Sequence, residues 1–231
     1  MGRICIFEAK LQVMRLLLSL LFFLFLLLFA TCRDDKKYHD ETPAAHSFQS
    51  GGSRQEALAF QQAMNETFKD PETSPLPDRY RKDFEGLDFF EPDSLYRVRA
   101  KIIRTPEAQP FLMPTTTARQ AREIRYGIAY FSLKGEEYKL ELYRSMEPPE
   151  DSSSKEQLFL PFLDNTNGDS TYEGGRYLDL DIPEGDSLII DFNKAYNPYC
   201  TYNKKYSCPI VPRVNYLDTE IRAGVKAFRM P

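Results

Sequence analysis

The residues best suited to bind a ligand gather in the stretch 171–208, late in this chain of 231 residues. A glycine pair there precedes Arg176 and Tyr177. Glycines let the backbone approach a ligand closely, and arginine binds carboxylate or phosphate through two parallel hydrogen bonds. Arg176 and Tyr177 are therefore candidate ligand-binding residues. The alternative is a β-bulge in which Arg176 pairs with a nearby carboxylate, for example Asp179 or Asp191.

A second polar and aromatic group follows in the sequence DFNKAYNPYC. It combines hydrogen-bonding side chains with aromatic faces in a loop whose backbone is restricted by Pro198. Such a loop either lines a pocket or buries a polar network that locks the C-terminal segment in place. The candidate ligand-binding residues from this group are Asp191, Asn193, Tyr196 and Asn197.

Cysteine usage indicates an oxidising compartment. Cys5 and Cys32 precede the predicted domain, which leaves Cys200 and Cys208 as an even pair within it. A disulfide between these two is the prediction, with two free thiols packed as small apolar groups as the alternative. The domain has no further thiol to complete a four-ligand zinc site, so no metal site is predicted.

Histidine is confined to the region before the predicted domain, at His39 and His46. A domain without histidine excludes Ser-His-Asp and Cys-His nucleophiles and histidine-ligated zinc. No catalytic residue is predicted, and no cofactor, because no phosphate-binding glycine loop follows a strand and opens a helix. A calcium loop at 164–169 fails the EF-hand pattern because Gly168 occupies a ligand position.

The N-terminal residues resemble an export signal. An uncharged apolar run at 16–31 follows Arg15 and ends at Cys32, and Met14 has the form of a normal start, so that 1–13 reads as an upstream extension. A membrane-spanning helix needs about 20 apolar residues, whereas the apolar part of a signal needs roughly 7–15. We therefore expect a signal peptide over 1–31, a lipidated Cys32 and a flexible tether over 32–52. The alternative is an uncleaved anchor.

Hydrophobic periodicity predicts one helix and then strands. The helix covers 53–69, with a capping box at Ser53 and Glu56 and an apolar stripe at helical spacing. Alternation of period 2 begins at Tyr96, and a hairpin turn is expected at Lys134-Gly135. The predicted strands are 96–102, 126–133, 138–143, 158–162, 177–182 and 187–192.

Successive strands without intervening helices indicate an antiparallel sheet. The predicted fold is mainly β, with residues 53–231 forming a single antiparallel β-sandwich or partly closed barrel that carries one N-terminal amphipathic helix.

Several strings of this chain resemble one bacterial family. They are GLDFFEPDSLYRV, the hairpin around YGIAYF, LFLPFLDNTNGDSTYEGGRYLDL, DFNKAYNPYC and the closing IRAGVKAF. The chain resembles the domain-of-unknown-function 1684 family over residues 60–228. The resemblance implies one mainly β domain, often exported in Bacteroidetes relatives, and no established activity.

These features together favour a binding protein at the cell envelope. We expect an outer-membrane lipoprotein, facing the periplasm or the cell surface, whose domain binds a small ligand, a glycan or an envelope partner. The formal net charge of −4 argues against nucleic acid as a partner. The alternatives are a purely structural envelope protein and a glycoside-type hydrolase that uses Glu173, Asp179 or Asp191 as acid and base.

Overall fold

The computed structural model describes residues 52–147 and 155–229. All of them belong to the second of two compact units, Lys36–Pro231. The predicted signal peptide, Cys32 and the tether up to residue 51 lie outside the described residues. Within the described ranges, no helix is both long enough and apolar enough to cross a membrane.

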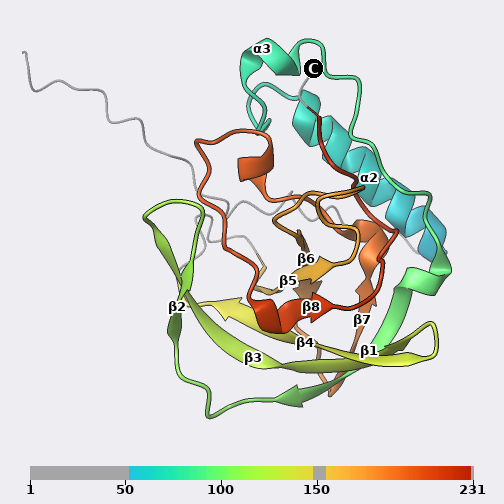
Figure 1. The fold of residues 1–231 in the computed structure, drawn as a ribbon, viewed down its shortest axis with the longest axis vertical. Helices are drawn as coiled ribbons and strands as arrows, with labels where there is room; N and C mark the ends of the chain where they lie inside the picture. The colour runs from blue at the N-terminus through green and yellow to red at the C-terminus, as the bar shows by residue number, and fades with distance from the viewer. Residues whose placement is uncertain (1–51, 148–154, 230–231) are drawn as a thin grey trace, which may run out of the picture. The chain divides into compact units, whose positions relative to one another are not determined.

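The described strands form one curled antiparallel sheet, a half-barrel (Figure 1). Its order is β6-β5-β4-β3-β1-β7, β2 pairs with β3, and the short β8 pairs in parallel with β5. The strand bounds are β1 Arg97–Arg104, β2 Phe111–Pro114, β3 Gln120–Leu133, β4 Glu136–Ser145, β5 Gln157–Asp164, β6 Arg176–Asp181, β7 Ser187–Asp191 and β8 Tyr216–Leu217.

The sequence periodicity predicted these strands because one face of the sheet is buried. In β1 the even-numbered residues from Val98 to Ile102 point into the core, and the basic residues between them face outward. The predicted turn is confirmed, with positive φ at Lys134 (55°) and Gly135 (86°), as a type I′ hairpin turn requires. Strand β3 starts at Gln120, six residues before the predicted boundary, because β2 pairs with this extension. The strands join a single sheet, so the β-sandwich alternative is not observed in the part described.

Helix α2 spans Ser53–Lys69, the predicted residues, and buries Ala57, Gln61, Met64 and Phe68. The predicted capping box at Ser53 and Glu56 is wrong by one residue, because Gly52 is the N-cap and its N–H donates to the side chain of Gln55 at 3.0 Å. The remaining helices are α3 Asp78–Arg81 and the 3₁₀ turns η1 Ser94–Tyr96, η2 Phe192–Lys194, η3 Tyr199–Thr201 and η4 Arg213–Asn215.

The core of the described residues has two large clusters of buried side chains and a small third one around Met113, Ala121 and Tyr143. The first fills the concave side of the sheet with residues such as Leu140, Leu160 and Phe162. The second lies between α2 and the C-terminal segment, where Phe68 packs edge-on against Tyr202. In Figure 1 the C-terminal segment rises from β8 and crosses α2 in this view. Its Ile221, Ala223 and Val225 are buried, whereas the charged Glu220 and Arg222 are exposed.

Asn215 joins two strands that diverge. Strands β4 and β5 pair at Tyr143 and Phe159. Farther along, the fully buried Asn215 accepts from the Glu141 N–H at 2.8 Å and donates to the carbonyls of Glu141 and Pro161 at 2.9 and 2.7 Å. The Asn215 side chain therefore replaces the backbone hydrogen bonds between β4 and β5 at this point, where Pro161 has no N–H to donate.

Candidate functional site

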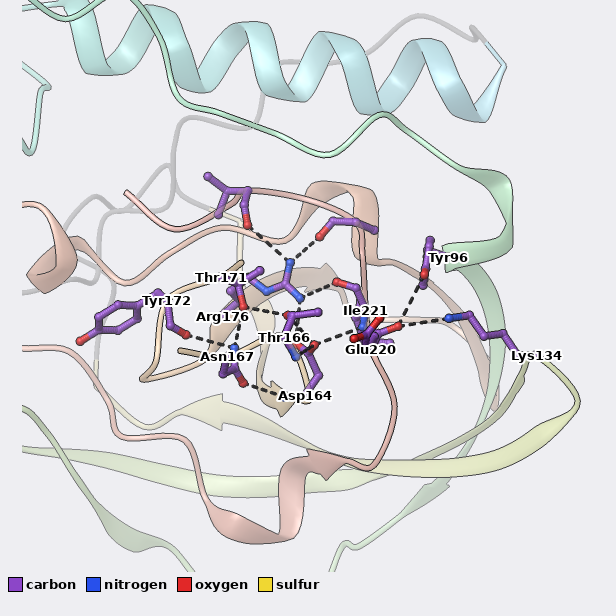
Figure 2. A network of polar contacts seen from close by, with 12 residues as sticks. Tyr96, Lys134, Asp164, Thr166, Asn167, Thr171, Tyr172, Arg176, Glu220 and Ile221 are labelled. Carbon is purple, nitrogen blue, oxygen red and sulfur yellow. Dashed lines mark hydrogen bonds and ion pairs between the residues drawn. The ribbon is translucent and has the colours of Figure 1, made fainter. Parts of the chain in front are cut away.

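Arg176, at the start of β6, lies at the centre of a buried polar network (Figure 2). Its guanidinium pairs with Asp164 at 2.8 Å and donates to the carbonyls of Ile221 and Ala223, the former at 2.8 Å. The side chains of Arg176 and Asp164 are both 0 % exposed. Burial lowers the pKa of Arg176, and the Asp164 charge opposes that shift. Arg176 was considered either as a ligand-binding residue or as the partner of a nearby carboxylate. In the structure it pairs with a carboxylate, that of Asp164 and not that of Asp179 or Asp191.

Asp164 uses both carboxylate oxygens within the protein. The Oδ1 atom accepts from the N–H and hydroxyl of Thr166 and from the Ile221 N–H, and Oδ2 accepts from Arg176. Asn167 in turn donates to the Thr171 hydroxyl at 2.9 Å. These contacts fold the 164–171 loop around its own side chains, as Figure 2 shows. Among the described residues, no group of three or more His, Cys, Asp or Glu side chains is arranged to hold a metal ion.

Asn193 and Asp191 connect two distant segments. Asn193 exchanges two hydrogen bonds of 2.9 Å with the backbone of Asp93, one donated and one accepted. Asp191 accepts from the Asn193 N–H and lies 3.6 Å from the Arg97 guanidinium. Both predicted residues thus hold the entry to β1 against the end of β7.

Tyr177, Tyr196 and Asn197 are also buried. The Tyr177 hydroxyl donates to the Pro209 carbonyl, and Asn197 donates to the Lys226 carbonyl at 3.1 Å. Tyr196 donates to Asp179, whose pKa is raised to about 6 by burial. Arg176, Tyr177 and Asn197 therefore hold the C-terminal segment, as in the locking alternative. Asp191 and Asn193 hold β1 against β7 instead, and Tyr196 bonds to β6.

A groove lies elsewhere, along the outward face of α2. It has a volume of about 450 Å³ and none of the six predicted residues lines it. Its wall combines apolar side chains with amides and one charge of each sign: Leu58, Gln61, Gln62, Asn65, Glu66, Lys69 and Phe89. Sequence reasoning used only the apolar stripe of this helix. The amide residues Gln61, Gln62 and Asn65 on this helix were the signal in the sequence that could have indicated the groove.

The predicted disulfide is not formed in this structure. Cys200 and Cys208 are free thiols, with the Cys200 N–H donating to the Cys208 sulfur at 3.1 Å. Hydrogen bonding from Cys208, and further from Thr116 and Tyr172, lowers the pKa of Cys200 to about 7. Interaction with Cys200 and burial raise the pKa of Cys208. Formation of the bridge under oxidising conditions stays a prediction.

The carboxylates considered for hydrolysis lie in different environments. Asp179 is bonded to Tyr196 on β6, Asp191 is paired with Arg97 at the end of β7, and Glu173 is exposed in a loop. None of the three lines the α2 groove. No pair of carboxylates is therefore placed to share a substrate there.

Comparison with known proteins gives a family and a fold. The solution NMR structure of an uncharacterized protein from Haloarcula marismortui is 33 % identical, with a TM-score of 0.59, and the match covers 74 % of this chain and 92 % of that one. A comparison with curated proteins finds no match. The sequence model of a protein family of unknown function, DUF1684, matches residues 82–226. With a family model that matches more than half of the chain and a relative of similar fold, the chain belongs to the DUF1684 family.

Proposed function

We propose that this protein is a lipid-anchored binding module of the cell envelope and that the α2 groove is its binding site. The observation that carries the proposal is the groove itself. Its volume of about 450 Å³ falls in the range of small-ligand sites, roughly 300–1,000 Å³. The anchor is Cys32, which follows the apolar run at 16–31.

The chemistry of the groove favours a neutral, hydroxyl-rich ligand. Gln61 donates to the Asn193 carbonyl, Gln62 donates to Glu66, and Asn65 accepts from the Leu87 N–H, so part of each amide remains for a ligand. Phe89 offers an aromatic wall against which the C–H face of a sugar can pack. The Lys69 ammonium makes no ion pair with any residue that the structure describes, so it is available to a ligand oxygen. A glycan fragment satisfies these groups better than a purely apolar molecule would.

The groove has no catalytic pair. Its lining contains one carboxylate, Glu66, which accepts from Gln62 at 3.0 Å, and contains neither cysteine nor serine. Acid–base hydrolysis of a glycoside uses two carboxyl groups. The groove therefore supports binding without turnover.

The test is a thermal-shift screen of the full chain in detergent with oligosaccharides, dicarboxylates, nucleotides and calcium. We expect a glycan to raise the melting temperature, and Lys69→Ala and Gln62→Ala to abolish that rise. Lys139→Ala and Gln109→Ala, at exposed positions on the sheet side, are the matched controls and should retain it. A ligand whose shift is unaffected by the groove variants would place the site elsewhere, and release of free sugar would show a hydrolase.

The anchor is tested separately by metabolic labelling with palmitate. We expect the label on the wild type and none on Cys32→Ser. An unlabelled wild-type chain would refute the lipoprotein proposal without bearing on the groove.

A further inference from the structure

We propose that Cys200 and Cys208 form a thiol–disulfide exchange site that reacts with disulfides of small thiols. Cys200 is the attacking thiol and Cys208 the resolving thiol. The proposal is independent of the α2 groove, because neither cysteine lines it.

The positions of the two thiols suit these roles. Cys200 lies in η3 and is partly exposed, whereas Cys208 is 0 % exposed. The intervening loop turns back through a hydrogen bond from the Tyr206 N–H to the Asn203 carbonyl at 3.1 Å. Cys200 is thus the more exposed of the two cysteines, and the Cys208 sulfur lies 3.1 Å from the Cys200 backbone nitrogen.

Thr116 is held against the backbone of Cys208 by two hydrogen bonds. Its Oγ1 accepts from the Cys208 N–H at 3.1 Å, and its own N–H donates to the Cys208 carbonyl at 2.9 Å. Hydrogen bonding from the side chains of Thr116 and Tyr172 contributes to the lowered pKa of Cys200. Hydroxyl groups that donate to a cysteine sulfur stabilise its thiolate.

The two pKa shifts fit the order of attack. The pKa of Cys200, lowered from 9.0 to about 7, leaves a large thiolate fraction at neutral pH, which is the condition for fast exchange. The Cys200 charge is one of the causes that raise the pKa of Cys208. Once Cys200 is bound in a mixed disulfide that charge is gone, and Cys208 ionises more easily. Tyr172 and Cys208 are the titratable groups that influence the pKa of Cys200, and Glu173 in turn influences that of Tyr172.

The reaction balances with a small disulfide, RSSR, as the oxidant. The Cys200 thiolate attacks one sulfur, which forms a Cys200–SR bond and releases RS⁻. Cys208 loses its proton and attacks the Cys200 sulfur, which forms the Cys200–Cys208 bond and releases the second RS⁻. The protons of the two cysteines convert both leaving groups to RSH, so two cysteines are oxidised and one disulfide is reduced.

The test uses the full-length reduced chain in detergent with 2-hydroxyethyl disulfide, followed by peptide mapping by mass spectrometry, which separates Cys5 and Cys32 from the site. We expect a Cys200–Cys208 link in the wild type, an accumulating mixed disulfide on Cys200 in Cys208→Ser, and no modification of Cys208 in Cys200→Ser. A dithiol should reverse the wild-type link while circular dichroism shows the protein folded. A link that forms only in unfolded protein, or cannot be reduced in folded protein, would mean a structural bridge and overturn the proposal.

A variant that keeps both cysteines provides the independent check. Thr116→Val removes one hydroxyl donor, and we expect alkylation of Cys200 by iodoacetamide to slow by about threefold at pH 7 and to be unchanged near pH 9.5. Thr117→Val, whose hydroxyl bonds to Ser207 instead, is the matched control. Equal rates in Thr116→Val and the wild type at pH 7 would contradict the role of Thr116 and the proposal with it.

Discussion

Arg176 donates to Asp164 at 2.8 Å in an ion pair from which solvent is fully excluded. The arginine stands at the start of β6, the carboxylate ends β5, and the same guanidinium also reaches the carbonyls of Ile221 and Ala223. One side chain thereby links two neighbouring strands to the last segment of the domain. The energetic consequence is that neither charge has water available as a substitute partner.

We predict that Arg176→Met lowers the free energy of unfolding by about 3–5 kcal/mol, because it leaves the Asp164 carboxylate buried without a counter-charge. Urea denaturation followed by circular dichroism measures the loss. The control is Arg54→Ala, which breaks the exposed Arg54–Glu91 pair and should cost less than about 1 kcal/mol. Equal losses in the two variants would contradict a structural role for the buried pair.

Asn215 provides a second prediction. Asn215→Ala removes three hydrogen bonds, one buried and two part-buried, and takes the side-chain partner from the Glu141 N–H and the Pro161 carbonyl. We expect a loss of about 3 kcal/mol or more and faster hydrogen exchange at the Glu141 amide. Asn165→Ala, at an exposed asparagine, serves as the control. If the Glu141 amide stays protected in Asn215→Ala, strands β4 and β5 are held together by other contacts.

Local patterns predicted the strands because each pattern reports a short-range cause. Alternation from Tyr96 reflects a sheet buried on one face, and Lys134-Gly135 reflects a turn that needs positive φ. The curling of the sheet depends on contacts between strands far apart in sequence. Periodicity therefore left sandwich and barrel equally open.

The candidate site was harder to predict because binding and locking use the same residue types. Arginine, asparagine and tyrosine near glycines suit a ligand cradle and a buried network equally well, and only burial separates them. The partner of Arg176 proved to be Asp164, twelve residues earlier, in a loop that had been weighed for calcium. The α2 groove needs Phe89 beside the helix, a contact that no local pattern encodes.

Gly224 is predicted to tolerate no side chain. Its φ is +75°, and an added Cβ would lie 2.6 Å from the Ala195 carbonyl oxygen. We expect Gly224→Ala to cost more than about 2 kcal/mol, from backbone strain and the steric clash together. Gly185→Ala, where no atom lies within 4 Å of the added Cβ, is the control and should change stability by less than about 0.5 kcal/mol. Thermal unfolding of the wild type and the two variants measures these losses of stability. A Gly224→Ala variant as stable as the wild type would mean that the C-terminal segment adjusts to the added Cβ.

Asp179 makes stability depend on pH between about 4 and 6. Burial raises the pKa of its carboxyl from 3.8 to about 6 in the folded protein, and the hydrogen bond from Tyr196 partly opposes that rise. In this interval the folded state keeps a proton that the unfolded state has lost, so the free energy of unfolding falls as the pH increases. The fall amounts to on the order of 2–3 kcal/mol and levels off above the folded pKa.

Urea midpoints measured from pH 4 to 8 test this dependence on pH. We expect Asp179→Asn to remove the decrease, because the amide does not titrate. Tyr196→Phe should extend the decrease to higher pH, since it removes the hydrogen bond that favours the charged carboxylate. A decrease that persists unchanged in Asp179→Asn would assign the titration to another group and refute the role of Asp179.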